Sequence, residues 1–393
     1  MTFTSTSILL HATAVALTTT MKPDSDPLRY PWGETMPGSG QSLELAPGIR
    51  WLRLDLPFAL DHINVWLLRD RHNDREGWTL VDCGVDQPAT RAQWECLVAS
   101  TLGGLPLVRI IATHMHPDHL GLAHWLCERW QAPLWISATD YATARVATMD
   151  ASGFAGERAA QFYRSMGLAD ESQLAAIRSR GNLYSRLVPA LPTSYRRLHH
   201  GQRLTIGGRQ WRCVAGYGHA PEHMALFCED EPILISGDMV LPRISTNVSV
   251  YASEPEADAL GLFLSSLVEY RSLPAETLVL PAHGRPFGGR GSQGAQGLHG
   301  RIAQLERHHR DRLADLLAAC ATQALSAAEA LPILFQRPIG PEQMTFALGE
   351  SVAHLHRLWH AGQLHRQADS QGVWRFRATA TAPVSSSAEP LPA

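Results

Sequence analysis

Cysteine is scarce in this chain, and no two cysteines stand at the Cys-x-x-Cys spacing of zinc ribbons or thioredoxin-like redox motifs. The six cysteines are dispersed, and most have apolar neighbours: Cys83, Cys96, Cys127, Cys213, Cys228 and Cys320. This distribution is typical of reduced, buried thiols and argues against the disulfide framework of a small secreted protein. We therefore expect a cytoplasmic protein without structural disulfides.

A strong charge of one sign and a long apolar run are lacking as well. The formal net charge is -3 and the sequence pI is about 6.7, so the chain has no general attraction for nucleic acid or an anionic membrane. No stretch approaches the roughly 20 apolar residues of a membrane span. The 393 residues suffice for one large domain and a smaller one, and we expect a small-molecule substrate as the partner.

One apolar run near the N-terminus needs a separate interpretation. Residues 8–17 have the length of the apolar part of a secretion signal, but no Lys or Arg precedes them and His11 interrupts them. We expect Met21 to be the true start, with residues 1–20 added by an over-long start assignment. Secretion stays open as the alternative.

A loop crowded with metal-binding groups is the most informative feature that the sequence does contain. The loop follows the apolar run 107–112, reads Thr-His-Met-His-Pro-Asp-His-Leu, and supplies His114, His116, Asp118 and His119. Side chains alternate in direction along an extended segment, so the first three groups can share one side, while a turn at the proline can bring the last one round. Imidazoles together with a carboxylate suit zinc or a similar divalent ion.

Four more apolar segments end in a histidine or an acid. They run over residues 78–81, 210–215, 232–236 and 277–280, and the groups that follow them are Asp82, His219, Asp238 and His283. In layered α/β proteins, the loops at strand ends gather at one edge of a sheet. We therefore predict that five strand ends meet at one metal site.

The order of these groups resembles that of a known family. An Asp-x-Gly turn, the His-x-His-x-Asp-His loop, and then His, Asp and His are similar to the metallo-β-lactamase superfamily of metal-dependent hydrolases, and most similar to its glyoxalase II and acyl-thioesterase members. The resemblance spans roughly residues 45–290. It implies an α/β fold, a four-layer αββα sandwich that we place at residues 45–295.

The resemblance also implies a role for each group. One metal would be held by His114, His116 and His219, the second by Asp118, His119 and His283, and Asp238 would bridge them. We expect two Zn²⁺ per chain, with iron or manganese as alternatives. The commonest zinc β-lactamases have cysteine where Asp238 stands, so the chain departs from them. Asp82 would accept a hydrogen bond from a ligand imidazole, and His223 is expected behind the ligands as a structural histidine.

Substrate contacts are predicted at three polar residues. Asn64 should lie near the site mouth by resemblance, although the polar segment around it can equally form a turn. Arg243 and Asn247 belong to the loop after Asp238. The arginine can pair with an anionic substrate group or with a surface carboxylate.

The segments around the catalytic domain are assigned by composition and periodicity. Residues 1–44 are expected to be an irregular lead-in and residues 378–393 a disordered tail. The helix-like insertion 140–191 is either a lid over the metals or a set of helices packed on the outside. Residues 296–377 predict three helices and a two-stranded hairpin, which resemble a winged helix.

A winged helix invites a nucleic-acid role, which the composition of its third helix does not favour. Glu350, His354 and His356 give that helix no basic recognition face at neutral pH, so we expect a packing or homodimerisation module. His308 and His309 are expected on a polar face of the first helix, with a substrate-anion contact as the alternative.

Hydrolysis is the reaction that such a site favours. A water activated between two metals would attack a carbonyl carbon, and Asp118 would accept the remaining proton. A thioester of acyl-CoA or acyl-glutathione type suits this site, because a thiolate leaves without strong protonation and the motifs contain no dedicated general acid. The alternatives are a lactonase, a sulfur dioxygenase with one iron on His114, His219 and Asp238, a ribonuclease or phosphodiesterase, or a non-catalytic metal-binding protein.

Overall fold

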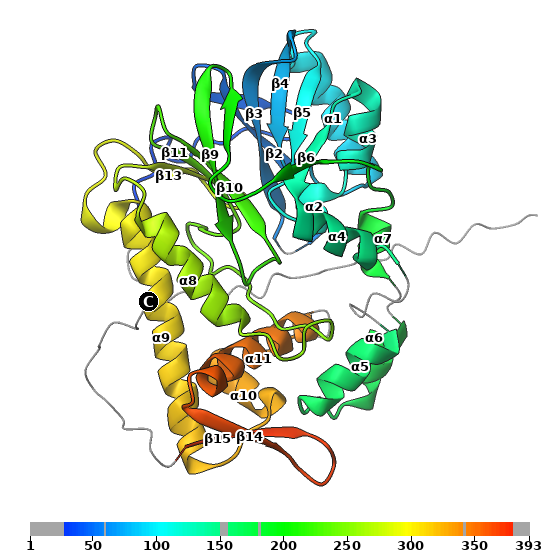
Figure 1. Ribbon diagram of the computed structural model, residues 1–393, viewed down its shortest axis with the longest axis vertical. Coiled ribbons are helices and arrows are strands. Elements are labelled where there is room, and N and C mark those ends of the chain that lie inside the picture. Colours follow the sequence, from blue (N-terminus) through cyan, green and yellow to red (C-terminus); the bar gives the residue numbers. More distant parts are fainter. Residues whose placement is uncertain (1–26, 59, 150–155, 180–181, 341–342, 380–393) are drawn as a thin grey trace, which may run out of the picture.

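The computed structural model describes residues 27–58, 60–149, 156–179, 182–340 and 343–379 (Figure 1). The expectations for residues 1–20, for a start at Met21 and for the tail beyond residue 379 lie outside the described residues. Among the described helices, none combines the length and the apolar character that crossing a bilayer requires.

A seven-stranded sheet forms the first half of the fold. Its strands are neighbours in chain order: β1 (Ser42–Ala46), β2 (Ile49–Asp55), β3 (His62–His72), β4 (Arg75–Val81), β5 (Leu107–Ile111), β6 (Leu134–Ser137) and β7 (Arg196–Leu198). The pairs from β1 to β4 are antiparallel. The pairs from β4 to β7 are parallel, because α1 (Pro88–Ser100), α3 (Ala123–Trp130) and the helical insertion return the chain to the same edge.

The lead-in is shorter than predicted. It was expected to reach residue 44, but Ser42–Ala46 forms the edge strand β1 and pairs with β2. Leu43 and Leu45 alternate with polar residues and pack against the core between the sheets, which explains why this short segment is a strand.

A six-stranded sheet forms the second half. Its order is β13-β12-β11-β10-β9-β8, with β8 (Arg203–Ile206), β9 (Arg209–Gly216), β10 (His223–Cys228), β11 (Ile233–Gly237), β12 (Leu278–Pro281) and β13 (Phe287–Gly288). β11 and β12 are parallel, and the helix α8 (Ala259–Arg271) connects them.

The buried side chains show four layers. Trp51, Trp66 and Trp211 lie in the core between the two sheets. Trp94 of α1 belongs to a second core, which α1 and α3 cover on the outer face of the first sheet. Phe263 of α8 belongs to a third core on the outer face of the second sheet. The predicted αββα sandwich is therefore confirmed (Figure 1).

The C-terminal elements follow the predicted order of three helices and a hairpin. They are α9 (Leu298–Thr322), which follows the short turn η1 (Gly294–Gln296), then α10 (Ala327–Leu334), α11 (Met344–His360), β14 (Leu364–Ala368) and β15 (Trp374–Ala378). α10 begins with the predicted capping box, in which the Ser326 hydroxyl accepts from the amide of Glu329 and the Glu329 carboxylate accepts from the amide of Ser326. The polar face predicted around His309 is wrong for that residue, because His309 is 0% exposed and hydrogen-bonds to His354.

The helical insertion consists of α4 (Ala138–Ala147), α5 (Gly156–Ser165), α6 (Glu171–Ser179) and α7 (Leu183–Leu187). α5 and α6 pack against the C-terminal helices (Figure 1), where Phe162 shares a core with Leu331 and the carbonyl of Met166 accepts from the amide of Ala328. In α7, the Tyr184 hydroxyl donates to the carbonyl of Met115 at 2.6 Å. The insertion thus joins the metal loop to the C-terminal helices, and its role as a lid stays a prediction.

Candidate metal centre

The crowded loop begins where β5 ends. Pro117 occupies the first turn of the short helix α2 (Pro117–Leu120), a position where its missing N–H costs no hydrogen bond. The helical turn places the amide of His119 3.0 Å from the carbonyl of His116. The turn therefore brings His119 back towards the preceding ligands, as the sequence predicted.

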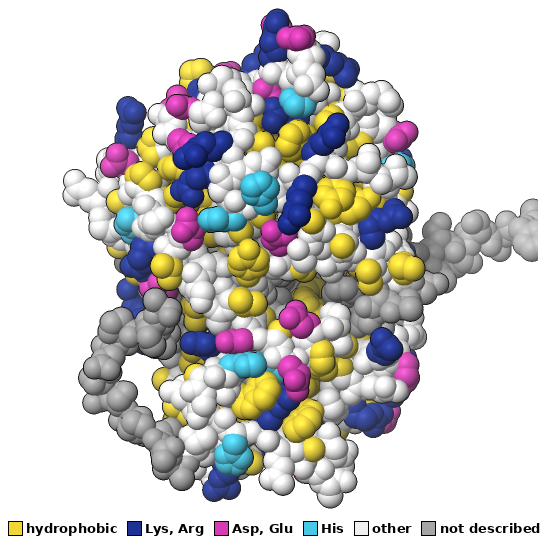
Figure 2. Space-filling view, in the orientation of Figure 1, with side chains coloured by type: hydrophobic (Ala, Val, Ile, Leu, Met, Phe, Trp, Pro, Cys, Tyr) yellow, Lys and Arg dark blue, Asp and Glu magenta, His cyan; other side chains and the backbone are white. Residues whose placement is uncertain are grey.

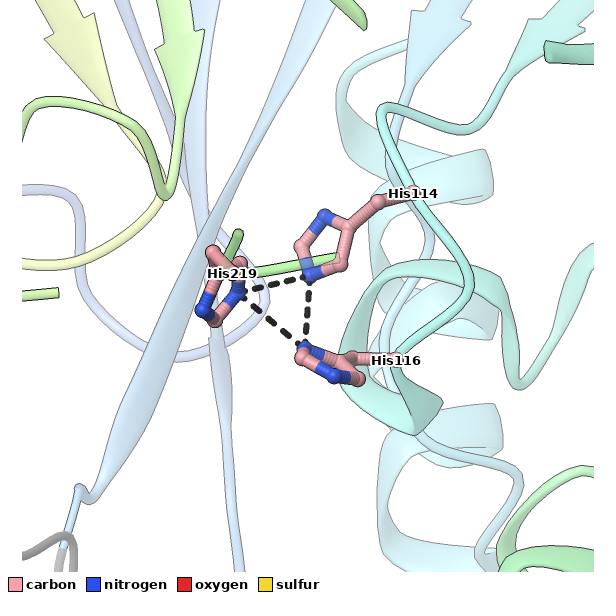
Figure 3. A group of neighbouring side chains, drawn as sticks. All are labelled: His114, His116 and His219. Carbon is pink, nitrogen blue, oxygen red and sulfur yellow. Dashed lines mark hydrogen bonds between the residues drawn. The ribbon is translucent and has the colours of Figure 1, made fainter. Parts of the chain in front are cut away.

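Three imidazoles converge at the first group of the site (Figure 3). His114 and His116 come from the loop after β5, and His219 comes from the loop after β9. The facing atoms are Nε2 of His114, Nδ1 of His116 and Nε2 of His219, and they lie 2.9, 3.1 and 3.2 Å apart.

These three nitrogens lie close enough to one another to share one metal ion. Burial holds the pKa of His114 well below its usual value and lowers that of His116 to about 3, so both rings are neutral. The Nδ1 atom of His219 lies 2.7 Å from the carbonyl of Asn247, which can only accept, so Nδ1 carries a proton and Nε2 faces the other two rings. A cation between the rings would satisfy the three nitrogens together.

A second group lies beside the first. The Oδ2 atom of Asp118 is 3.6 Å from Nε2 of His119 and 3.4 Å from Nε2 of His283. Burial opposes the protonation of His119, but the nearby carboxylates of Asp82, Asp118 and Asp238 outweigh it and raise the pKa of His119 to about 9. The local charge therefore favours a positive group here, a proton or a metal ion.

Asp238 lies between the two groups. Its Oδ2 atom is 3.2 Å from Nε2 of His219, and its Oδ1 atom is 3.5 Å from Nε2 of His119 and 3.4 Å from Nε2 of His283. Within the described residues, Asp238 Oδ1 and His119 Nε2 are buried without a hydrogen-bond partner. Ligand atoms of a tetrahedral zinc, at about 2.0–2.1 Å from the metal, lie about 3.4 Å from one another, so the donor set fits metal ions.

Buried partners orient the ligands from behind. The Oδ2 atom of Asp82 lies 2.8 Å from Nδ1 of His119, and the carbonyl of His62 accepts from Nδ1 of His283 at 2.7 Å. The Nε2 atom of His223 accepts from the amide of Asp238 at 3.2 Å. Asp82 thus lies behind the ring of His119, and His223 lies behind the backbone of Asp238.

Asp140 is a supporting residue that the sequence analysis missed. Its Oδ1 atom accepts from the amide of Met115 at 2.8 Å, and its Oδ2 atom accepts from the amide of Glu222 at 2.6 Å. One carboxylate therefore ties the loop of His116 to the loop of His219. The only sequence signal is the pattern Ser-x-x-Asp at Ser137, where the serine caps α4, and that pattern does not reveal the long-range contacts.

Two predicted substrate contacts take other roles in the structure. Asn64 is 0% exposed, and its amide donates to the carbonyls of Pro281 and Gly284, so it braces the loop of His283 instead of facing a substrate. The side-chain amide of Asn247 is engaged within the protein by Ser249 and Glu350. Arg243 is exposed, and its predicted anion contact stays a prediction.

Comparisons with known proteins agree with this geometry. The family profile "Metallo-beta-lactamase superfamily" matches residues 59–283, and the profile "Metallo-beta-lactamase-like, C-terminal domain" matches residues 313–379. A crystal structure of a beta-lactamase domain protein from Burkholderia ambifaria is 48% identical, covers 90% of this chain and 98% of that one, and has a TM-score of 0.83. A metallo-beta-lactamase family protein from Thermus thermophilus is 27% identical, with 86% and 100% covered and a TM-score of 0.68.

Curated relatives are similar over shorter parts of the chain. The probable metallo-hydrolase YflN of Bacillus subtilis (strain 168) is 26% identical over 212 residues, which are 52% of this chain and 68% of that protein. A human hydroxyacylglutathione hydrolase-like protein is 37% identical over 93 residues, which are 22% of this chain and 30% of that protein. With its sandwich fold, its convergent histidines and acids and these matches, the chain belongs to the metallo-beta-lactamase superfamily.

Proposed function

We propose that this chain is a dinuclear zinc hydrolase that cleaves a thioester of acyl-CoA or acyl-glutathione type. Membership of the superfamily supports the coarser statement, a metal-dependent hydrolase. The observation that carries the finer one is the position of Asp238, whose two oxygens face the two groups of the site separately. A carboxylate in that position can bind two cations, one through each oxygen. A carboxylate that served one cation alone would not need both of its oxygens to face metal-binding groups.

In this proposal, each cation has its own set of ligands. His114, His116 and His219 would hold one ion, Asp118, His119 and His283 the other, and Asp238 both. Two divalent ions in these positions lower the pKa of a water and polarise the group under attack. The protein would contribute their placement, because Asp82, His223 and the carbonyls of His62 and Asn247 fix the ligand rings and the bridging carboxylate.

Asp118 is the group that we assign to proton transfer. Burial opposes its ionisation, but His119 and His283 outweigh burial and lower its pKa to about 2, so it is a carboxylate at neutral pH. Its side chain is 17% exposed, more than that of Asp238 at 11%. Asp118 can therefore accept a proton from the side on which a substrate arrives.

A thioester fits this set of groups because its leaving group needs little help. Metal binding requires deprotonated ligands, so none of the seven ligands carries a proton for a poor leaving group such as an amine at the start of the reaction. A thiolate leaves without strong protonation. The local similarity to a hydroxyacylglutathione hydrolase-like protein supports the same choice.

The surface and the C-terminal helices support a small molecule as the partner. Acidic and basic side chains are interspersed over the face in Figure 2, which offers no extended basic track for a phosphate backbone. α11 is buried over most of its length among α8, α9 and α10, so it is not available to enter a groove of a nucleic acid. We propose a packing or homodimerisation role for the winged-helix-like part, and a cytoplasmic location on the basis of the free cysteines.

The test is elemental analysis of the purified chain, followed by a panel of acyl-CoA, acyl-glutathione and lactone substrates. Two zinc ions per chain and turnover of a thioester are expected. Turnover of lactones alone would move the proposal to a lactonase. One iron per chain with oxygen uptake would indicate a sulfur dioxygenase instead of a hydrolase. Cleavage of RNA would indicate a phosphodiester substrate instead of a thioester.

A further inference from the structure

We propose that Glu350 of α11 is a positioning residue for the metal centre, which acts through Asn247 on the orientation of His219. The C-terminal helices would then take part in building the site, and not only in packing against it. This inference rests on the proposed metal centre but not on the proposed thioester substrate.

The first step is the contact between His219 and Asn247. The Nδ1 atom of His219 lies 2.7 Å from the carbonyl oxygen of Asn247, and its Nε2 atom faces His114 and His116. The two nitrogens belong to one rigid ring, so the position of the carbonyl sets the direction in which Nε2 points. A shift of the Asn247 backbone would turn His219 away from the other two histidines.

The second step is the contact between Asn247 and α11. The Nδ2 atom of Asn247 donates to Oε2 of Glu350 at 3.3 Å, and its Oδ1 atom accepts from the Ser249 hydroxyl at 2.9 Å. Glu350 is only 3% exposed, so water cannot easily replace its carboxyl group. The carboxyl group therefore holds the residue whose carbonyl orients His219.

Backbone groups of the loop that contains Asn247 also contact the C-terminal helices. The amide of Val250 donates to the carbonyl of Gly349 at 3.1 Å, and a Cβ atom on Gly349 would lie 2.9 Å from the side chain of Ser249. On the other side, Nη2 of Arg301 in α9 donates to the carbonyl of Ile244 at 2.8 Å. α9 and α11 thus contact the loop from two sides. Among these contacts, that of Glu350 is made to Asn247, the residue whose carbonyl faces His219.

The charge of Glu350 is compatible with this position. Burial raises its pKa to about 8, so the carboxyl group is mostly neutral at neutral pH and can accept from Asn247 without adding a negative charge behind the site. A glutamine at this position would keep an acceptor for the same amide. An alanine would remove the protein partner of the half-buried Asn247 amide.

The experiment measures zinc affinity of the full chain by competition with a chromophoric chelator, starting from metal-free protein. E350A is expected to lower the affinity for one of the two zinc ions about 10-fold. This is the lower end of the loss that follows when a residue supporting a metal ligand is removed. E350Q should stay within about 2-fold of wild type, because it keeps the acceptor. The matched control is S351A, which removes a buried hydrogen bond of the next residue to Ala327 and should leave both affinities unchanged.

A second variant tests the same link from the loop side. N247A should weaken the binding of the same zinc ion as E350A. The double variant should lose no more affinity than N247A alone, because N247A already removes the contact with Glu350. Visible spectra of the Co²⁺-loaded variants should show the altered coordination in E350A and N247A but not in S351A.

Wild-type zinc affinity and spectra in E350A and N247A would overturn this inference alone. An equal loss in E350A, E350Q and S351A would overturn it too, since that pattern indicates general destabilisation. A wild-type chain that binds no metal would overturn this inference together with the proposed function, whereas absence of thioester turnover in a chain that binds zinc would leave it standing.

Discussion

The Nδ1 atom of His119 lies 2.8 Å from Oδ2 of Asp82, and both side chains are buried. Asp82 also accepts from the amide of Thr113 at 2.8 Å, and it has a φ of 61°, in the left-handed region that few residues other than glycine adopt. One strained aspartate therefore fixes both the start of the metal loop and the ring of its last histidine.

Replacing Asp82 by asparagine should weaken metal binding. The new NH2 group must face either the Thr113 amide or Nδ1 of His119, both of which are donors. A loss of about 10- to 100-fold in zinc affinity is expected for D82N, measured by chelator competition. D86N in the same turn removes a partner of Arg91 instead and should bind zinc like wild type.

H116A should remove both metal loading and turnover of the chain's substrate. The variant deletes the nitrogen that faces His114 and His219, so the first group keeps two of its three imidazoles. Metal content and initial rates measure the effect, and H199A, which removes an exposed histidine, is the control. Full turnover by metal-depleted H116A would contradict the scheme.

Asp140 should be important for stability even without metal. D140A leaves the buried amide of Met115 and the half-buried amide of Glu222 without their acceptor, at about 1–3 kcal/mol for a fully buried unsatisfied group. Urea unfolding of the metal-free protein should therefore show a loss of about 3 kcal/mol in D140A. The exposed Asp170 accepts from the amides of Ser172 and Gln173 at the start of α6, and D170N keeps an oxygen acceptor for them. D170N should therefore unfold at the same urea concentration as wild type.

Glu350 should make stability depend on pH. Its folded pKa of about 8 exceeds its usual value of 4.5, so the folded chain keeps a proton that the unfolded chain releases. The stability that Glu350 contributes is fully present below pH 4.5 and is lost as the pH rises through 8. Burial raises the pKa of Glu350, and Asn247 and Arg312 only partly offset this rise. The unfolding free energy of metal-free wild type minus that of E350Q should fall by about 2.5 kcal/mol from pH 6 to 8.5. A constant difference would show that Glu350 does not titrate in this range.

The convergence of the candidate ligands was predictable from the sequence, because they lie in loops that follow recognisable strands. His114, His219, Asp238 and His283 lie at the ends of apolar runs, and the topology brings those ends together. The capping box of α10 was predictable for the same reason, because both of its partners lie within four consecutive residues.

The supporting contacts were not predictable, because they join residues far apart in the chain. Asp140 reaches Glu222, and Glu350 reaches Asn247, through loops whose approach only the folded structure shows. Polarity was also misleading for Asn64 and His309. Both are buried with protein partners, and the sequence alone does not separate such residues from exposed polar ones.

The number of zinc ions bound by wild type and by D238A shows whether Asp238 bridges two metal ions. Asp238 faces both groups of the site, so its removal should affect both ions. Elemental analysis of zinc-loaded, desalted protein should give two zinc ions per wild-type chain and fewer than one per D238A chain. One metal ion per wild-type chain, or two zinc ions retained by D238A, would contradict the bridged dinuclear centre.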